Sequence, residues 1–302
     1  MKPVIIDFAP GAHEALALYY AARLALDIKA VTLSGIFQGF DRSAPSAAGI
    51  CREVGIEAPV FAGAEQPIII GRDLCDRYPR QLPTAPGGIE KHICCRSSRE
   101  SGDDHAGYAW DAIYRHACEA TGKLEVICLG PLTNLAIAIF KYPDLKQMIS
   151  RVVFYGGALD WGNAGRTAEI NLAADPHAAD AISKSGMEII MVPWSVSRDL
   201  GIEPGQLRLT GYAGQLVELI LERERIPLED PFVLNHTLAV MLAADDSHFT
   251  IMKHIIRIET KSSLCMGRTC PNLMYSLKKD PPNMGVVRTV DAASLVEFVA
   301  GL

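Results

Sequence analysis

The chain has 302 residues, of which 49% are hydrophobic and 21% are charged, and its formal net charge is −6 at pH 7. This composition is typical of a globular protein with a large core, and it excludes a disordered tail or a linker. The negative charge argues against nonspecific nucleic-acid binding, which requires Lys and Arg to neutralise phosphates. No run of about 18 apolar residues occurs, so we expect no transmembrane helix and no membrane partner.

Apolar runs alternate with helix-forming segments over most of the chain. The periodicity of the apolar residues predicts strands at residues 4–6, 28–33, 59–62, 124–129, 152–155, 188–192 and 255–259. It predicts helices at residues 15–25, 43–54, 110–120, 173–185, 213–225, 231–243 and 292–299. Such alternation indicates an α/β fold with a mostly parallel central sheet flanked by helices. We expect one domain over residues 1–302, with a helical region toward the C-terminus and irregular structure at 261–285.

Residues 64–107 carry many Pro, Gly and Arg and show little periodicity. The segment is too long for an ordinary connection, so we expect a functional loop or a flap. A polar cluster, Asp103-Asp104-His105, lies near its end. The alternative interpretation of this cluster is a solvated loop.

The eight cysteines are scattered, and only Cys94 and Cys95 are adjacent. This pattern predicts reduced thiols in the cytoplasm and no zinc site built from cysteines. The first residues lead directly into a strand, so we expect no signal peptide.

Residues 4–16 combine a buried strand, a tight turn at a Pro-Gly pair and the start of a helix. Polar side chains at the carboxyl end of a parallel strand face the crevice in which α/β proteins bind ligands. Asp7, His13 and Glu14 are therefore candidate site residues. The alternative is ordinary turn chemistry before a helix N-terminus, where the helix dipole stabilises an acidic side chain such as Glu14.

This segment resembles the opening signature of the inosine–uridine nucleoside hydrolases, which reads D-x-D-P-G-x-D-D-A between a strand and a helix. Asp7, the Pro-Gly pair and Ala15 match that signature. The second, third and fourth Asp of the signature are replaced by Ala9, His13 and Glu14.

Further motifs of the same family follow in the same order. Residues 129–135 read L-G-P-L-T-N-L, which is the family's motif without a change. The family's G-G-A, G-N, E-F-N and D-P motifs correspond to residues 156–158, 162–163, 169–171 and 175–176. Asp230-Pro231 resembles the family's H-D-P motif, with Glu229 in place of the His. The matches extend from residue 4 to about residue 232, so we expect the fold of this family.

The resemblance implies hydrolysis of the N-glycosidic bond of a ribonucleoside or a related N-riboside by water. The transition state of this reaction resembles an oxocarbenium ion. In the family, a calcium ion contributes to the activation of the attacking water and to the binding of the ribose hydroxyls. The resemblance assigns the metal site to Glu14, the carbonyl of Thr133 and Asp230, with Asp7 in support.

Calcium prefers six to eight oxygen ligands, several of them charged. Ala9 offers no side-chain oxygen, and Glu14 is one methylene longer than the Asp that it replaces. We therefore expect that calcium binding is weakened or lost. His13, Glu14 and Asp230 form a set of nitrogen and oxygen donors that suits zinc or another transition metal better.

The residues expected to bind the sugar hydroxyls are better preserved. By resemblance these are Asn163, Glu169, Asn171 and Asp230, and Tyr155 is expected to line the sugar pocket. Amide and carboxylate groups supply the donors and acceptors that a diol needs. Taken singly, Asn163 could be a turn residue, Glu169 a surface charge and Asn171 a strand-edge hydrogen bond.

Two residues are candidates for proton transfer. His13 occupies the place of the family's general base. Glu229 takes the place of the His that serves as acid for the leaving base, and burial would raise the pKa of its carboxyl group enough for this role. His105 and His236 are alternative proton donors, and each also has a structural interpretation.

Three hypotheses follow for the function. The first is an N-riboside hydrolase that uses His13 as base, with calcium absent or replaced. The second is a catalytically weak or silent relative that binds a ribosyl ligand, and the third is an interaction scaffold. The family resemblance further implies a small-molecule nucleoside as partner and a homo-oligomer, either a dimer or a tetramer. The sequence specifies neither the base preference nor the natural substrate.

Overall fold

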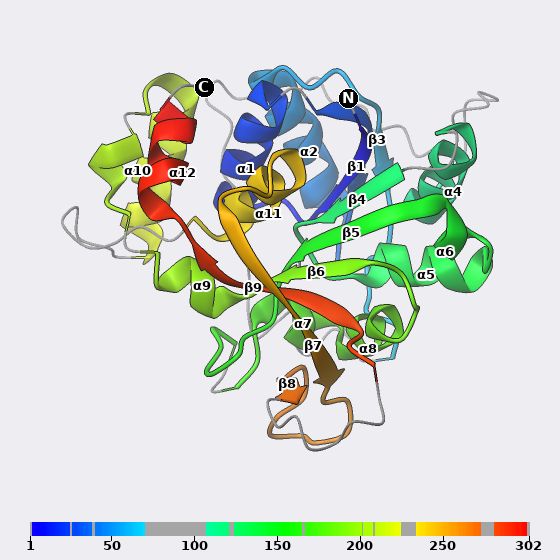
Figure 1. Cartoon of the computed structure of the whole chain (residues 1–302). Helices are drawn as coiled ribbons and strands as arrows, with labels where there is room; N and C mark the ends of the chain where they lie inside the picture. The colour runs from blue at the N-terminus through cyan, green and yellow to red at the C-terminus, as the bar shows by residue number, and fades with distance from the viewer. Residues whose placement is uncertain are drawn as a thin grey trace.

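A mostly parallel sheet lies at the centre of the molecule (Figure 1). Within the described residues, its strand order is β3-β2-β1-β4-β5-β6-β9-β7-β8. Neighbouring strands from β3 to β9 are parallel, whereas β7 runs antiparallel to β9 and to β8. The strands are β1 (Pro3–Phe8), β2 (Asp27–Leu33), β3 (Val60–Ala62), β4 (Leu124–Cys128), β5 (Ile149–Tyr155), β6 (Ile189–Val192), β7 (Phe249–Ile258), β8 (Thr269–Asn272) and β9 (Met284–Val290).

The computed structural model describes residues 2–24, 26–37, 40–69, 107–120, 124–164, 167–200, 202–207, 209–224, 234–272 and 281–300. Four predictions fall outside these ranges: Glu229, Asp230, His105 and most of the expected loop at residues 64–107.

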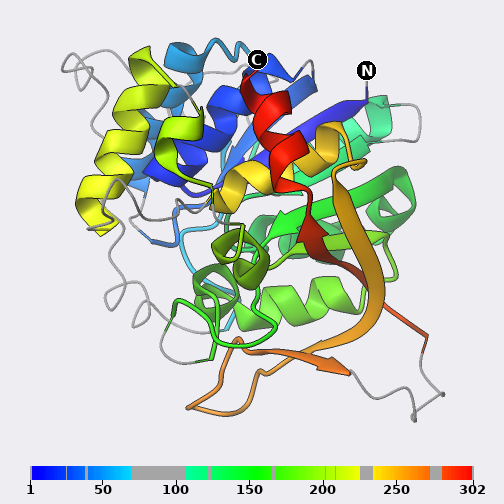
Figure 2. The same cartoon turned by 60° about the vertical axis from the view of Figure 1, so that its left-hand side comes forward.

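Helices cover both faces of the sheet (Figures 1 and 2). They are α1 (Ala12–Arg23), α2 (Phe40–Val54), α4 (Ala109–Glu119), α5 (Thr133–Lys141), α6 (Leu145–Met148), α7 (Ile170–Ala174), α8 (Pro176–Ser183), α9 (Trp194–Arg198), α10 (Gly211–Glu224), α11 (Asn235–Ala244) and α12 (Ala292–Ala300). One core joins the sheet to α1, α2 and α9 to α12, and a second core joins its other face to α4 to α8. Among the described helices, none combines the length and the apolar character needed to cross a membrane.

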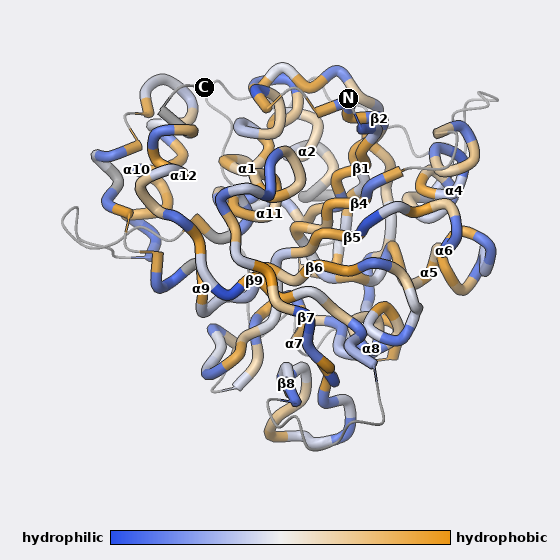
Figure 3. Tube along the Cα trace, in the orientation of Figure 1, coloured by the Kyte–Doolittle hydropathy of each residue, from blue (hydrophilic) through white to orange (hydrophobic). Residues whose placement is uncertain are grey.

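The two cores share the strands because successive side chains of a strand point to opposite faces. Ile6 of β1 belongs to the core around α1, while its neighbour Ile5 belongs to the core around α5. Both are fully buried, which explains the continuous apolar runs in the sequence. Figure 3 shows the same apolar strands at the centre of the molecule.

The predicted α/β fold with a mostly parallel sheet is confirmed. The structure differs from the prediction at a few particular elements. The segment 261–285 is not wholly irregular, because it contains β8 and the start of β9, and β9 lies between β6 and β7. The single helix expected at 173–185 is two helices. Asp175 separates them, since it caps α8 by accepting a hydrogen bond from Ala178 N, and Pro176 occupies the first turn of α8.

Candidate active site

Asp7 lies near the carboxyl end of β1 and is completely buried. Its Oδ1 accepts hydrogen bonds from Thr32 Oγ1 at 2.6 Å and from Asn134 Nδ2 at 2.7 Å. Its Oδ2 has no hydrogen-bond partner among the described residues. Burial raises the pKa of Asp7 to about 7, although the two hydrogen bonds act to lower it. Asp7 is thus a buried carboxyl group that changes charge near neutral pH.

Thr133, the predicted carbonyl ligand, is the first residue of α5, directly after the N-cap Leu132. Its hydroxyl donates to Asp175 Oδ2 at 2.6 Å, and this oxygen also accepts from Ile68 N at 2.9 Å. The neighbouring Asn134 accepts from Ala64 N at 2.8 Å. The L-T-N motif therefore attaches residues 64–68 to the carboxyl ends of the strands.

His13 and Glu14 stand in the first turn of α1, directly after the tight turn. The Glu14 side chain folds back over Gly11, and its Oε2 would have to shift to admit a Cβ atom there. His13 Nε2 lies 2.7 Å from Glu224 Oε1, at the end of α10. Glu14 Oε1 lies 3.2 Å from His236 Nε2, near the start of α11.

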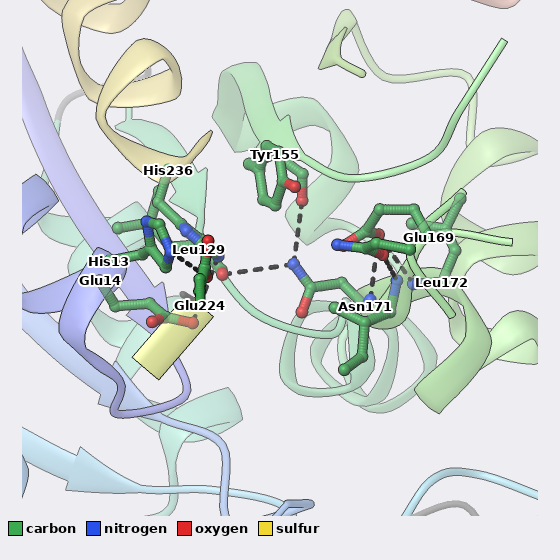
Figure 4. A network of polar contacts seen from close by, with 11 residues as sticks. His13, Glu14, Leu129, Tyr155, Glu169, Asn171, Leu172, Glu224 and His236 are labelled. Atoms are coloured by element: carbon green, nitrogen blue, oxygen red, sulfur yellow. Dashed lines mark hydrogen bonds and ion pairs between the residues drawn. The ribbon is translucent and has the colours of Figure 1, made fainter. Parts of the chain in front are cut away.

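These contacts form two adjacent His–Glu pairs (Figure 4). The ring centroids of His13 and His236 are 5.9 Å apart, and the Tyr155 ring lies 4.4 Å from that of His236. Glu14 and His236 are buried, whereas 15% of the His13 side chain and 43% of the Glu224 side chain are exposed. The pair formed by His13 is therefore the one that opens to solvent.

Two of the predicted sugar-binding residues, Tyr155 and Asn171, connect to this cluster. Asn171 Nδ2 donates to the carbonyl oxygens of Leu129, at 3.4 Å, and Tyr155, at 3.3 Å. These carbonyls mark the carboxyl ends of two neighbouring strands, β4 and β5. Tyr155 thus contacts His236 through its ring and Asn171 through its carbonyl, and it connects the two halves of the network in Figure 4.

Glu169 is completely buried, so its interpretation as a surface charge is wrong. It is the N-cap of α7, and its Oε2 accepts hydrogen bonds from the backbone N–H groups of Gly157, Asn171 and Leu172. Asn163 Oδ1 accepts from Ile170 N at 2.9 Å. These contacts fix the loop that follows β5 against the start of α7.

Two members of the cluster were not assigned to it from the sequence. His236 was expected only as an alternative proton donor, and Glu224 was not singled out. For His236, the available signal was its place at the start of an apolar helix, the same kind of position as that of His13. The described helix α11 begins at Asn235, and the predicted opening at Pro231 lies outside the described residues.

The described residues supply only part of the donor set expected for a calcium ion. The side chain at Ala9 supplies no oxygen, and the carboxylate of Glu14 faces His236. Oδ1 of Asp7 accepts two hydrogen bonds, whereas its Oδ2 has no hydrogen-bond partner among the described residues. Within the described part of the chain, no three or more His, Cys, Asp or Glu side chains are grouped so that they could hold a metal ion. Asp230, the remaining predicted ligand, lies outside that part.

The mostly parallel sheet flanked by helices defines an α/β protein, and the cluster lies at the carboxyl ends of its strands, where proteins of this class bind ligands. The family model of the inosine-uridine preferring nucleoside hydrolases matches residues 4–297, so the chain belongs to that family. The predicted resemblance and the predicted enzyme class, a hydrolase acting on N-glycosyl bonds, are confirmed.

Relatives and solved structures of the same kind match almost the whole chain. The pyrimidine-specific ribonucleoside hydrolase RihB of Escherichia coli O1:K1 / APEC is 27% identical over 302 residues, covering 96% of this chain and 93% of that protein. The plant nucleoside hydrolase PpNRh1 is 24% identical with a TM-score of 0.77, over 99% of this chain and 98% of the other. The purine-preferring ribonucleoside hydrolase from Gardnerella vaginalis is 23% identical with a TM-score of 0.76, over 99% and 97%.

Proposed function

We propose that this protein hydrolyses the N-glycosidic bond of a ribonucleoside or a related N-riboside, with His13 as the general base. The observation that carries the proposal is the 2.7 Å contact between His13 Nε2 and Glu224 Oε1 at the partly open edge of the site. A carboxylate that accepts from one ring nitrogen leaves the other nitrogen to take a proton from water. This His–Glu pair would do the work that a single carboxylate does in the family's signature.

His13 lies in the first turn of α1, directly after the turn that follows β1. Glu224 offsets the positive charge that develops when the ring accepts a proton. The pair therefore supports proton transfer from water to His13 during the reaction.

For the sugar, we propose Asn163, Glu169, Asn171 and Asp230 as binding residues, with Tyr155 lining the pocket. The proposal is supported by Asn171, which contacts the ends of β4 and β5, and by Tyr155, whose ring lies against His236. The hydrogen bonds of Glu169 and Asn163 hold the loop after β5 in one arrangement, which would preorganise the site for a ribose.

We propose Glu229 as the acid that protonates the leaving base. The alternative acid among the residues that the structure describes is His236. His236 is held by Glu14 and by the Tyr155 ring, next to His13. For the metal, we propose that calcium binds weakly or not at all, because the described donors do not form a calcium site.

We propose a small nucleoside as partner, a homo-oligomeric assembly (a dimer or a tetramer) and a cytoplasmic location. The five described cysteines, Cys51, Cys118, Cys128, Cys265 and Cys270, form no disulfide, which supports a reducing compartment. The base preference stays open, because one relative is named pyrimidine-specific and another purine-preferring.

A panel of purine and pyrimidine ribonucleosides tests the proposed activity, with released ribose as the readout. We expect turnover of at least one ribonucleoside by the wild-type protein, and turnover that persists in the presence of a chelator. A second function, binding of a ribosyl ligand without turnover, is favoured by the loss of a carboxylate at Ala9. It predicts ribose-dependent thermal stabilisation together with no release of ribose from any substrate.

A further inference from the structure

We infer that Glu224 is a positioning residue that fixes the ring orientation and the tautomer of His13. The inference rests on the proposed function, in which His13 accepts a proton from the attacking water. Glu224 would contact neither the substrate nor the attacking water, and would act on the reaction through His13 alone. Its Oε1 lies 2.7 Å from His13 Nε2.

The packing of two helices sets this contact. Helix α10 packs against α1, and both contribute side chains to the same core. Leu216, Ile220 and Leu221 are buried on the apolar side of α10. Glu224 lies on the same helix, so the buried face of α10 fixes where this carboxylate meets the first turn of α1.

The two side chains come from separate helices. His13 is the second residue of α1, and Glu224 lies on α10, 211 residues further along the chain. Preferences that act within one helix do not account for this contact, which points to a role for the pair itself.

The chemistry of imidazole explains what the contact would do. A neutral His carries its proton on one of its two ring nitrogens. The hydrogen-bond partner of the ring decides which nitrogen carries it. A carboxylate only accepts hydrogen bonds, so Glu224 selects the form of His13 with a proton on Nε2. The lone pair is then on Nδ1, the nitrogen that would receive the proton of the water.

The exposure of the pair makes this role testable. Glu224 is 43% exposed and His13 is 15% exposed, so the contact contributes little to folding and variants at Glu224 are expected to fold. The second pair, Glu14 with His236, is buried and serves less well for the test.

Steady-state kinetics with the best ribonucleoside of the panel tests the inference. A Gln side chain can present either an oxygen or an NH₂ group, so Glu224→Gln no longer selects one tautomer. We expect kcat to fall about 10- to 100-fold with KM changed less than about twofold, and Glu224→Asp to recover part of kcat. Glu222→Gln, which removes an exposed charge from the same helix end, is the matched control and should keep wild-type kinetics.

The double variant separates positioning from a general structural effect. If Glu224 acts only through His13, then His13→Ala combined with Glu224→Gln is no slower than His13→Ala alone. Multiplicative losses, or an equal loss in Glu222→Gln, would overturn the inference while leaving the hydrolase proposal intact. Failure of the wild-type protein to cleave any ribonucleoside would overturn both proposals.

Discussion

His236 Nε2 lies 3.2 Å from Glu14 Oε1, and both side chains are buried between α1, α11 and the ring of Tyr155. Glu14 occupies the position of a metal-ligand carboxylate in the family's signature, yet its described charged partner is an imidazole. This relationship predicts that folding depends on the pair and that the site does not depend on calcium.

His236→Ala should destabilise the protein by about 3 kcal/mol or more, because removing one partner leaves the other charge buried. The measurement is the free energy of unfolding from urea titration. His13→Ala is the control, since the His13–Glu224 pair is partly exposed and should contribute no more than about 1 kcal/mol. Equal losses in the two variants would contradict the assignment of one buried and one open pair.

Asp7 should make stability depend on pH near neutrality. Its pKa is raised from 3.8 to about 7 in the folded state, mainly by burial. The folded protein therefore binds this proton more tightly than the unfolded chain, so the contribution of Asp7 is greatest below pH 4 and is lost as the pH rises through 7.

The variant Asp7→Asn keeps an acceptor for Thr32 and Asn134 and removes the titration. At about 1.4 kcal/mol per pH unit, the wild-type protein should lose about 3 kcal/mol relative to Asp7→Asn between pH 5 and pH 8. Urea unfolding at several pH values, in buffer with a chelator, measures this difference. A difference that stays constant with pH would mean that Asp7 is already ionised in the folded protein at pH 5.

Calcium content gives a third prediction. After gel filtration, elemental analysis should find calcium well below one ion per chain, because the described donors do not form a site of six to eight oxygens. Added calcium at millimolar concentration should leave the melting temperature unchanged, since a ligand stabilises only a protein that binds it. Stoichiometric calcium, or clear stabilisation by calcium, would show that the altered opening signature still binds calcium.

The fold was predictable from the sequence up to β6 because each step there is local. A buried strand followed by an amphipathic helix can be recognised from the pattern of residues that are close in the chain. The late strands were not predictable in the same way. The strand β9 (Met284–Val290) has a short apolar run and includes Gly285, and its place between β6 and β7 depends on pairing with distant segments.

The candidate site shows the same contrast between residues that are close in the chain and residues that only the fold brings together. Asp7, His13 and Glu14 were identifiable because they stand together after the first strand. Glu224 lies 211 residues beyond His13, and only the packing of α10 on α1 brings them together. His236 reaches Glu14 through the packing of α11 on α1 in the same way.

The most direct measurement is the ratio of kcat/KM between the wild-type protein and His13→Ala for the ribonucleoside that the wild-type protein cleaves best. A general base contributes about 100- to 10,000-fold, so kcat/KM should fall by at least about 100-fold. Thermal stabilisation by ribose should survive in the variant, because the groups proposed to hold the sugar remain. A His13→Ala protein that retains wild-type kcat/KM would contradict the assignment of His13 as the base.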